Sequence, residues 1–101
     1  MTVATQAQRL KWVEEERQHL AAHRVVTADG REVRKGDVLP ASRGEVFTFL
    51  YLTRAPGDGS ATQGKILVRP VAGGGDREYY PQVFGLRVER IAGASSPWDA
   101  S

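Results

Sequence analysis

The stretch RGEVFTFLYLTRAPGDG, residues 43–59, decides the fold of this chain. Eight consecutive residues in it, Val46 to Thr53, are apolar, aromatic or threonine, which predicts a long β-strand. A strand with one face in water alternates apolar and polar side chains, and this stretch does not alternate. We therefore expect both faces of the strand to be covered, and the rest of the chain must supply the cover.

A small closed sheet accounts for one of the two faces, because its long strand bends and contributes to both halves of the sheet. The side chains expected to share its interior are Val46, Leu50, Leu52, Ile66, Val68, Leu86 and Val88, with Thr48 near them. Phe47, Phe49 and Tyr51 then point outward. Because the stretch is apolar on both sides, the opposite assignment of faces fits the pattern as well.

The beginning of the chain predicts an α-helix over about residues 6–23. Thr5 and Gln8 have the spacing of a capping box, in which each side chain bonds a free backbone N–H of the first turn. Neither glycine nor proline interrupts the segment, and strong helix formers dominate it.

An apolar stripe on this helix is expected to cover the outward face of the long strand. Leu10, Val13 and Leu20 form the stripe. A helix of about 18 residues is marginal alone in water, and an exposed row of aromatic side chains is unusual. If the stripe packs over Phe47 and Phe49, the helix gains stability and the aromatic side chains are covered.

The remaining sequence predicts short strands separated by glycine-rich turns. Turn signals lie at residues 29–30 and 35–37, and residues 55–64 form a loop whose tip is expected to be mobile. The expected β-elements are a hairpin around residues 29–30, a short strand at Val38 and Leu39, strands at 45–54, 65–71, 77–80 and 86–91, and a 3₁₀ turn at 81–85. The expected division of the chain is a helix at 1–23, a small β-barrel at 24–91 and a flexible tail at 92–101.

The segment GREVRKGDVLPASRGEV, residues 30–46, resembles the start of a KOW-type small barrel. It has a Lys-Gly-Asp turn, an apolar strand and a further glycine, although Pro40 interrupts the strand and the second glycine comes early. The predicted 3₁₀ turn directly before the last strand also resembles the arrangement in Src-homology-three-type barrels. The resemblance implies an α+β fold that is mainly β, with the N-terminal helix packed on a five- or six-stranded SH3-like barrel.

A second resemblance covers about residues 29–91. The segments RGEVFTFLYLTRAP, GKILVRP and REYYPQVFGL are similar to a group of small proteins carried by phages of actinobacteria, a group without an established activity. This resemblance implies a phage accessory protein acting in the cytoplasm of a bacterial host. The resemblance does not identify any functional residues.

Length and composition narrow the classes of function. A chain of 101 residues is expected to form one domain, and without cysteine it has neither disulfides nor thiolate metal sites. Its longest apolar run is too short to span a bilayer, so we expect no membrane partner. Residues 1–16 lack the basic and apolar regions of a secretory signal. We therefore expect a cytoplasmic location.

Catalysis and metal binding find little support in the sequence. His19 and His23 lie four residues apart on one helix face, a spacing that can hold zinc, but a zinc site needs further ligands. The ordinary alternative is two solvated histidines near a helix end. Carboxylates lie near predicted turns, where turn and cap roles are usual: Asp29, Glu32, Asp37 and Glu45. We expect no enzyme activity, no cofactor and no metal.

A protein-interaction module is the leading functional hypothesis. The aromatic-rich segment at the 3₁₀ turn carries Tyr79, Tyr80, Pro81 and Phe84. Tyrosine often anchors interfaces, and the resemblance to Src-homology-three-type barrels implies a peptide groove in this region. Trp12, which lies off the helix stripe, is a further candidate for contact with a protein partner, or with a second copy in a homodimer.

A nucleic-acid-binding barrel is the alternative hypothesis. Residues 24–91 carry eleven basic and eight acidic side chains, a slight and well-mixed excess. The candidate phosphate-binding residues are Arg54, Lys65, Arg69, Arg77 and Arg87. They equally suit solvated strand positions paired with acidic neighbours.

Overall fold

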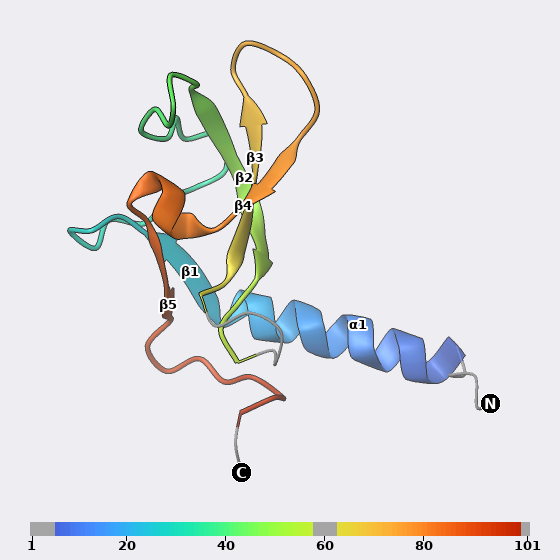
Figure 1. The fold of residues 1–101 in the computed structure, drawn as a ribbon. Helices are drawn as coiled ribbons and strands as arrows, with labels where there is room; N and C mark the ends of the chain where they lie inside the picture. The colour runs from blue at the N-terminus through green and yellow to red at the C-terminus, as the bar shows by residue number, and fades with distance from the viewer. Residues whose placement is uncertain (1–5, 58–62, 100–101) are drawn as a thin grey trace.

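The computed structural model describes residues 6–57 and 63–99. Its elements are α1 (Gln6–Ala21), β1 (His23–Val26), β2 (Phe47–Arg54), β3 (Lys65–Pro70), β4 (Arg77–Tyr79), the 3₁₀ helix η1 (Pro81–Phe84) and β5 (Arg87–Arg90). The strands form two antiparallel sheets, β2-β3-β4 and β1-β5 (Figure 1). The predicted α+β class with an N-terminal helix is confirmed. Over the described ranges the two sheets do not close into a barrel.

The helix ends at Ala21, two residues before the predicted end. Its last turn closes with the N–H of Ala22 bonding the carbonyls of Gln18 and His19. The next residue, His23, already belongs to β1, where it pairs with Arg90 of β5. Pairing with a strand more than sixty residues away therefore stops the helix, since no local breaker stands at this point of the sequence.

Phe47 and Phe49 of β2 face the core, so the expectation that they point outward is wrong, whereas the expected exposure of Tyr51 is confirmed. Phe47 and Phe49 are 2% and 5% exposed. Tyr51 lies on the surface, and so does Val46, which was expected inside. The phenylalanines are buried in preference to Val46 because burying an aromatic ring removes more apolar area from water than burying a valine.

A β-bulge explains why β2 does not alternate. Phe49 pairs with Val68, but Tyr51 pairs with Leu67, so Leu50 is an extra residue on β2. An extra residue shifts the side chains that follow it to the opposite face. Leu52 accordingly packs at the edge of the core on the side of Phe49, and the adjacent Leu50 is also buried.

The core joins the two sheets and the segment between them. Its buried members are Val25, Val33, Leu39, Phe47, Phe49, Ile66, Val68, Phe84 and Leu86. The predicted interior positions Ile66, Val68 and Leu86 are confirmed, and Val88 packs at the core's edge. The predicted short strand at residues 38–39 is a single bridge, in which the N–H of Leu39 bonds the carbonyl of Phe47 at 2.8 Å.

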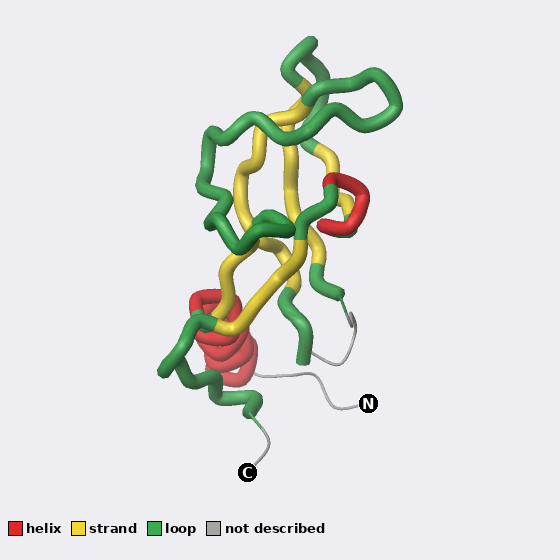
Figure 2. Tube along the Cα trace, turned by 90° about the vertical axis from the view of Figure 1, so that its left-hand side faces the viewer, coloured by secondary structure: helices red, strands yellow, loops and turns green. Residues whose placement is uncertain are grey.

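The helix does not cover the sheet. Figure 1 shows α1 projecting away from the strands, and Figure 2 shows it lying at one end of them. Leu10 and Val13 are 62% and 53% exposed. The expectation that they cover Phe47 and Phe49 is therefore wrong, because the two rings are already buried and leave no outward aromatic face.

A buried histidine holds the C-terminal end of the helix. His19 is 3% exposed, so it is not the solvated residue expected from the sequence. Its Nε2 lies 2.9 Å from the carbonyl of Pro56, and its Nδ1 lies 2.7 Å from Oγ of Ser96. A carbonyl only accepts hydrogen bonds, so Nε2 donates to Pro56. Both ring nitrogens are thus bonded to segments outside the helix.

The segment after β5 also contacts the C-terminal half of the helix. Trp98 donates from Nε1 to the carboxylate of Glu15 at 2.8 Å, and its ring centre lies 5.0 Å from that of His19. Asp99 accepts from the guanidinium of Arg90. The segment was expected from the sequence to be a flexible tail. Up to Asp99 it makes these contacts, and residues 100–101 lie outside the described ranges, as does the predicted mobile tip at 58–62.

His23 is bound to the same end of the helix. Its Nδ1 lies 2.7 Å from the carbonyl of His19, and the two imidazole rings meet edge to face with centres 4.7 Å apart. Partial burial lowers the pKa of His23, because the charged ring loses solvation there. Within residues 6–57 and 63–99, no helix has the length and apolarity needed to cross a membrane.

Replacing Phe49 with alanine is expected to lower the free energy of unfolding by about 3–5 kcal/mol, since it empties a ring-sized space in the core. The matched control is Tyr51→Ala, an exposed ring on the same strand, which should change it by less than about 0.5 kcal/mol. Urea unfolding followed by circular dichroism measures both. A larger loss for Tyr51→Ala than for Phe49→Ala would contradict the observed orientation of β2.

Candidate protein-binding site

The corner between β4 and η1 is shaped by its own sequence. Tyr80 is extended and leaves β4, and Pro81 starts the 3₁₀ turn with the φ angle that the turn requires. Gly85 ends the turn in the left-handed region at φ 69°, and its N–H bonds back to the carbonyl of Gln82. The corner thus holds Phe84 pointing into the protein, where it is 4% exposed.

Three aromatic rings meet beneath this corner. The ring centres of Phe47 and Tyr79 lie 5.6 Å apart, those of Phe47 and Phe84 lie 5.6 Å apart, and those of Tyr79 and Phe84 lie 5.8 Å apart. All three pairs are edge to face, the arrangement that places the positive edge of one ring on the negative face of another. The three rings thus form an apolar floor beneath the corner.

A hollow of about 330 Å³ lies over this floor. The residues that line it are Ser42, Arg43, Glu45, Phe47, Tyr79, Val83 and Phe84. Its volume is at the low end of the range of about 300–1,000 Å³ for small-molecule pockets. The hollow therefore suits one or two side chains of a partner better than a large cofactor.

An arginine and a glutamate stand on the rim of the hollow. The guanidinium of Arg77 lies 3.3 Å from the carboxylate of Glu45 and 5.7 Å from the ring centre of Phe47. Its Nη1 also donates to the hydroxyl of Tyr79 at 3.4 Å. The hydrogen bonds to Tyr79 and to Glu45 raise the pKa of Arg77 above its ordinary value, so it stays charged. These contacts give one side of the rim a fixed, mutually neutralised polar edge.

The turn that carries Glu45 also carries a strained arginine, Arg43, which lines the hollow. Ser42 and Glu45 exchange two backbone hydrogen bonds of 2.9 Å, which closes a two-residue hairpin turn over Arg43 and Gly44. Both turn residues have positive φ, 52° for Arg43 and 80° for Gly44. A type I′ turn needs this geometry and prefers asparagine or glycine at both positions. In the described part of the chain, the Arg43 side chain has no ion pair to explain its presence there.

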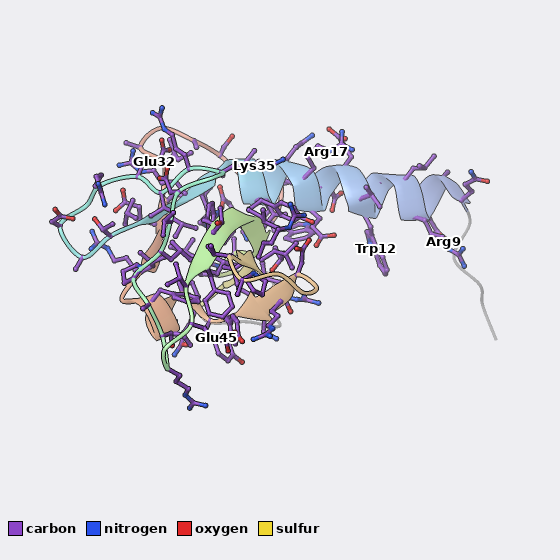
Figure 3. All side chains as sticks on the ribbon, turned by 90° about the horizontal axis from the view of Figure 1, so that it is seen from above. Arg9, Trp12, Arg17, Glu32, Lys35 and Glu45 are labelled. Atoms are coloured by element: carbon purple, nitrogen blue, oxygen red, sulfur yellow. The ribbon has the colours of Figure 1, made fainter. Side chains whose placement is uncertain are left out.

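The structure brings together some of the residues expected to bind protein. Tyr79 and Phe84 line the hollow, and Pro81 is buried behind it. Tyr80 is 49% exposed, with Nζ of Lys65 lying 5.4 Å from its ring centre. Trp12 is on the projecting helix, away from this corner (Figure 3).

Five residues that line the hollow were not predicted from the sequence to belong to the site. They are Ser42, Arg43, Glu45, Phe47 and Val83. The available signal was an Arg-Gly pair between residues able to form a hairpin, which differs from the usual Asn-Gly or Asp-Gly by its first residue. The link between this turn and β4 depends on chain pairing that the sequence does not display.

Four of the five candidate phosphate-binding residues lie beside carboxylates. Charged atoms are within 4 Å in each of these pairs: Lys65 with Glu78 (3.7 Å), Arg69 with Asp76 (2.8 Å), Arg77 with Glu45 (3.3 Å) and Arg87 with Glu89 (3.4 Å). The hydrogen bond from Arg69 lowers the pKa of Asp76, so this carboxylate stays charged. Arg54, the fifth candidate, is the last residue of β2.

The histidine pair does not form the beginning of a metal centre in the described residues. Both nitrogens of His19 are bonded to other groups of the protein, and Nδ1 of His23 is bonded to the carbonyl of His19. No cluster of three or more histidine, aspartate or glutamate side chains with suitable spacing occurs within 6–57 and 63–99.

Comparisons with known proteins provide no family for this chain. No protein-family model matches it, and neither a curated protein nor a solved structure is significantly similar to it. The candidate site therefore rests on its geometry.

Replacing Arg43 with glycine is expected to raise the free energy of unfolding by about 0.5–1 kcal/mol, because glycine adopts the positive φ without strain. Lys35→Gly is the control, since it removes an exposed cation from a turn residue whose φ is not positive. We expect Lys35→Gly to be neutral or destabilising, because glycine makes the unfolded chain more flexible. Thermal unfolding measures both, and a destabilised Arg43→Gly protein would contradict the strain.

Proposed function

We propose that this protein is a non-enzymatic protein-interaction module that binds a segment of a partner protein at the hollow between the 42–45 turn and η1. The observation that carries the proposal is an apolar floor of three interlocked rings beside an arginine kept at a strained turn position. Strained residues are retained where the surrounding structure or a function requires them, and here the described contacts of Arg43 provide no structural reason.

The chemistry of the hollow favours an apolar side chain next to an acidic one. The floor formed by Phe47, Tyr79 and Phe84 can bury an apolar side chain of the partner. Glu45 is already neutralised by Arg77, whereas Arg43 has no carboxylate beside it among the described residues. A carboxylate of the partner at that edge would satisfy the guanidinium, which binds carboxylates in a planar, two-point geometry.

The surroundings of the hollow extend the contact surface. Val83 is 46% exposed at its lip, and the exposed Tyr80 follows β4 on the other side of Pro81. Tyrosine and arginine are enriched among the residues that anchor interfaces. A partner segment of several residues therefore fits this corner better than an isolated small molecule.

We extend the proposal to the type of fold and its setting. The two sheets, with a 3₁₀ turn before the last strand, support an SH3-like arrangement in which this corner corresponds to the peptide groove. The resemblance of residues 29–91 to proteins of actinobacterial phages supports an accessory role. The protein then binds a host or phage protein in the bacterial cytoplasm.

Selection of peptides from a random library on the immobilised protein tests the proposal. We expect enriched peptides to carry an apolar residue with an aspartate or glutamate nearby. Val83→Glu should weaken binding of such a peptide by about tenfold or more, because it places a charge at the lip of the apolar hollow. Val71→Glu is the matched control, since Val71 is also exposed but does not line the hollow, and it should bind like the natural protein.

Arg43→Gly adds a second criterion to this selection. This substitution should weaken binding of the selected peptide by about tenfold, while the protein stays at least as stable as the natural one. A selection without enrichment, or a peptide bound equally by the Val83→Glu and Val71→Glu proteins, would contradict the proposed site.

A nucleic-acid-binding module is the second candidate function. It is favoured by one observation, the exposed Tyr80 ring next to Lys65, a combination that can stack a base and contact its phosphate. The pairing of Lys65, Arg69, Arg77 and Arg87 with carboxylates counts against it, because these charges are already neutralised. We therefore rank it below protein binding.

Retention on single-stranded and duplex DNA and RNA distinguishes the two functions. For a protein-interaction module we expect no retention at about 50 mM salt, where phosphate-driven binding is strong. Lys65→Glu with Arg69→Glu serves as the control for any residual retention. Retention that falls steeply with rising salt and is lost in that variant would favour the nucleic-acid function instead.

A further inference from the structure

The projecting helix presents a face that nothing in the described structure covers. Trp12 is 68% exposed and Val13 is 53% exposed, and they lie next to each other near the middle of α1. The described side-chain hydrogen bonds that hold α1 to the other segments lie in its C-terminal half, at Glu15 and His19. An isolated helix of this length is marginal in water, so its exposed half gains stability from a partner.

Four residues define this face, which we name the Trp12 face: Arg9, Trp12, Val13 and Glu16. Their spacing of three, four and seven places them on one side of an α-helix. Figure 3 shows Arg9 and Trp12 projecting from the same side of α1, with Arg17 on the opposite side. The face thus has two apolar residues at its centre, a cation at one end and an anion at the other.

The charges at the two ends of the Trp12 face are unpaired among the described residues. The other charged side chains of the helix bond within it, Lys11 to Glu15 at 3.8 Å and Arg17 to Glu14 at 3.5 Å. Arg9 and Glu16 have no such neighbour in the described part of the chain. Arg9 and Glu16 are seven residues apart along the helix axis, which is too far for their side chains to form an ion pair with each other.

We propose that the Trp12 face binds the same face of a second copy of this chain, with the two helices antiparallel. A two-fold axis at the level between residues 12 and 13 places Trp12 of one copy opposite Val13 of the other, and Arg9 of one copy opposite Glu16 of the other. Each Trp12 ring then packs on Val13 of the other copy, and each Arg9 meets Glu16 of the other copy. A two-fold interface requires this kind of self-complementary patch.

The charge pattern selects the antiparallel orientation. In a parallel pair, Arg9 would lie beside Arg9 and Glu16 beside Glu16, and like charges in contact are unfavourable. In the antiparallel pair, both contacts become attractive and lie at the rim of a small apolar centre, where they determine orientation more than affinity. Because a single helix face is small, we expect a weak dimer, with a dissociation constant of about 1–100 μM.

Charge reversal on the full-length protein tests this arrangement, with sedimentation velocity over a range of protein concentrations as the measurement. Arg9→Glu alone and Glu16→Arg alone each place two like-charge pairs across the interface, so each should weaken self-association at least about tenfold. An equimolar mixture of the two variants restores two attractive pairs and should associate as the natural protein does. The double variant Arg9→Glu with Glu16→Arg should also recover self-association.

Lys11→Glu is the matched control. It changes the net charge by the same amount as Arg9→Glu, but Lys11 already bonds to Glu15 and lies outside the Trp12 face, so association should stay near the natural value. Trp12→Ala should abolish the dimer, and circular dichroism shows whether helix content is kept. The mixture keeps the test decisive if a single variant loses helix, because two acidic or two basic faces can recover only by pairing with each other.

The proposal is overturned by a protein that remains monomeric at concentrations up to about 500 μM, well above the expected dissociation constant. It is equally overturned by a dimer that the single charge reversals leave unchanged, or by variants whose mixture does not recover. These outcomes do not affect the hollow at η1, since the two surfaces share no residue.

Discussion

The inward orientation of Phe47 and Phe49 is the constraint on which the rest of the structure depends. Both rings are buried in the core, which also includes residues of β1, β3 and η1. Phe47 also touches the rings of Tyr79 and Phe84, so it belongs at once to the core and to the floor of the hollow. A change of Phe47 is therefore expected to affect stability and the candidate binding site together.

The same orientation leaves the helix without a sheet to cover. With Phe47 and Phe49 buried, the side-chain hydrogen bonds described between α1 and the other segments lie in its C-terminal half, at the buried imidazole of His19 and at Glu15, which accepts from the indole of Trp98. A buried polar group must keep its hydrogen bonds, and His19 keeps one on each nitrogen. The helix is thus attached firmly at one end, while the residues near Trp12 stay open to solvent.

Electrostatics in this protein concerns recognition more than stability. The ion pairs on β3, β4 and β5 are exposed, and such pairs contribute little to the free energy of folding. They do neutralise most of the basic side chains of the strands. Among the charged side chains without a described ion pair, Arg43 lines the hollow and Arg9 and Glu16 lie on the exposed helix, where a second molecule can bind them.

Local sequence patterns predicted the N-terminal helix, the strands at 45–54, 65–71, 77–80 and 86–91, and the 3₁₀ turn at 81–85, and the structure has each of these elements with slightly shorter bounds. Each follows from nearby propensity, turn chemistry or periodicity. Part of the site was also visible, since Tyr79 and Phe84 stand at that turn. Only the tertiary structure decided which face of β2 is buried, because the stretch is apolar on both sides and the bulge at Leu50 moves one residue across. It also decided that His19 is buried, that Trp98 bonds to the helix, and that Arg43 and Tyr79 line the same hollow. These facts depend on segments distant in the chain, whose pairing no local pattern encodes.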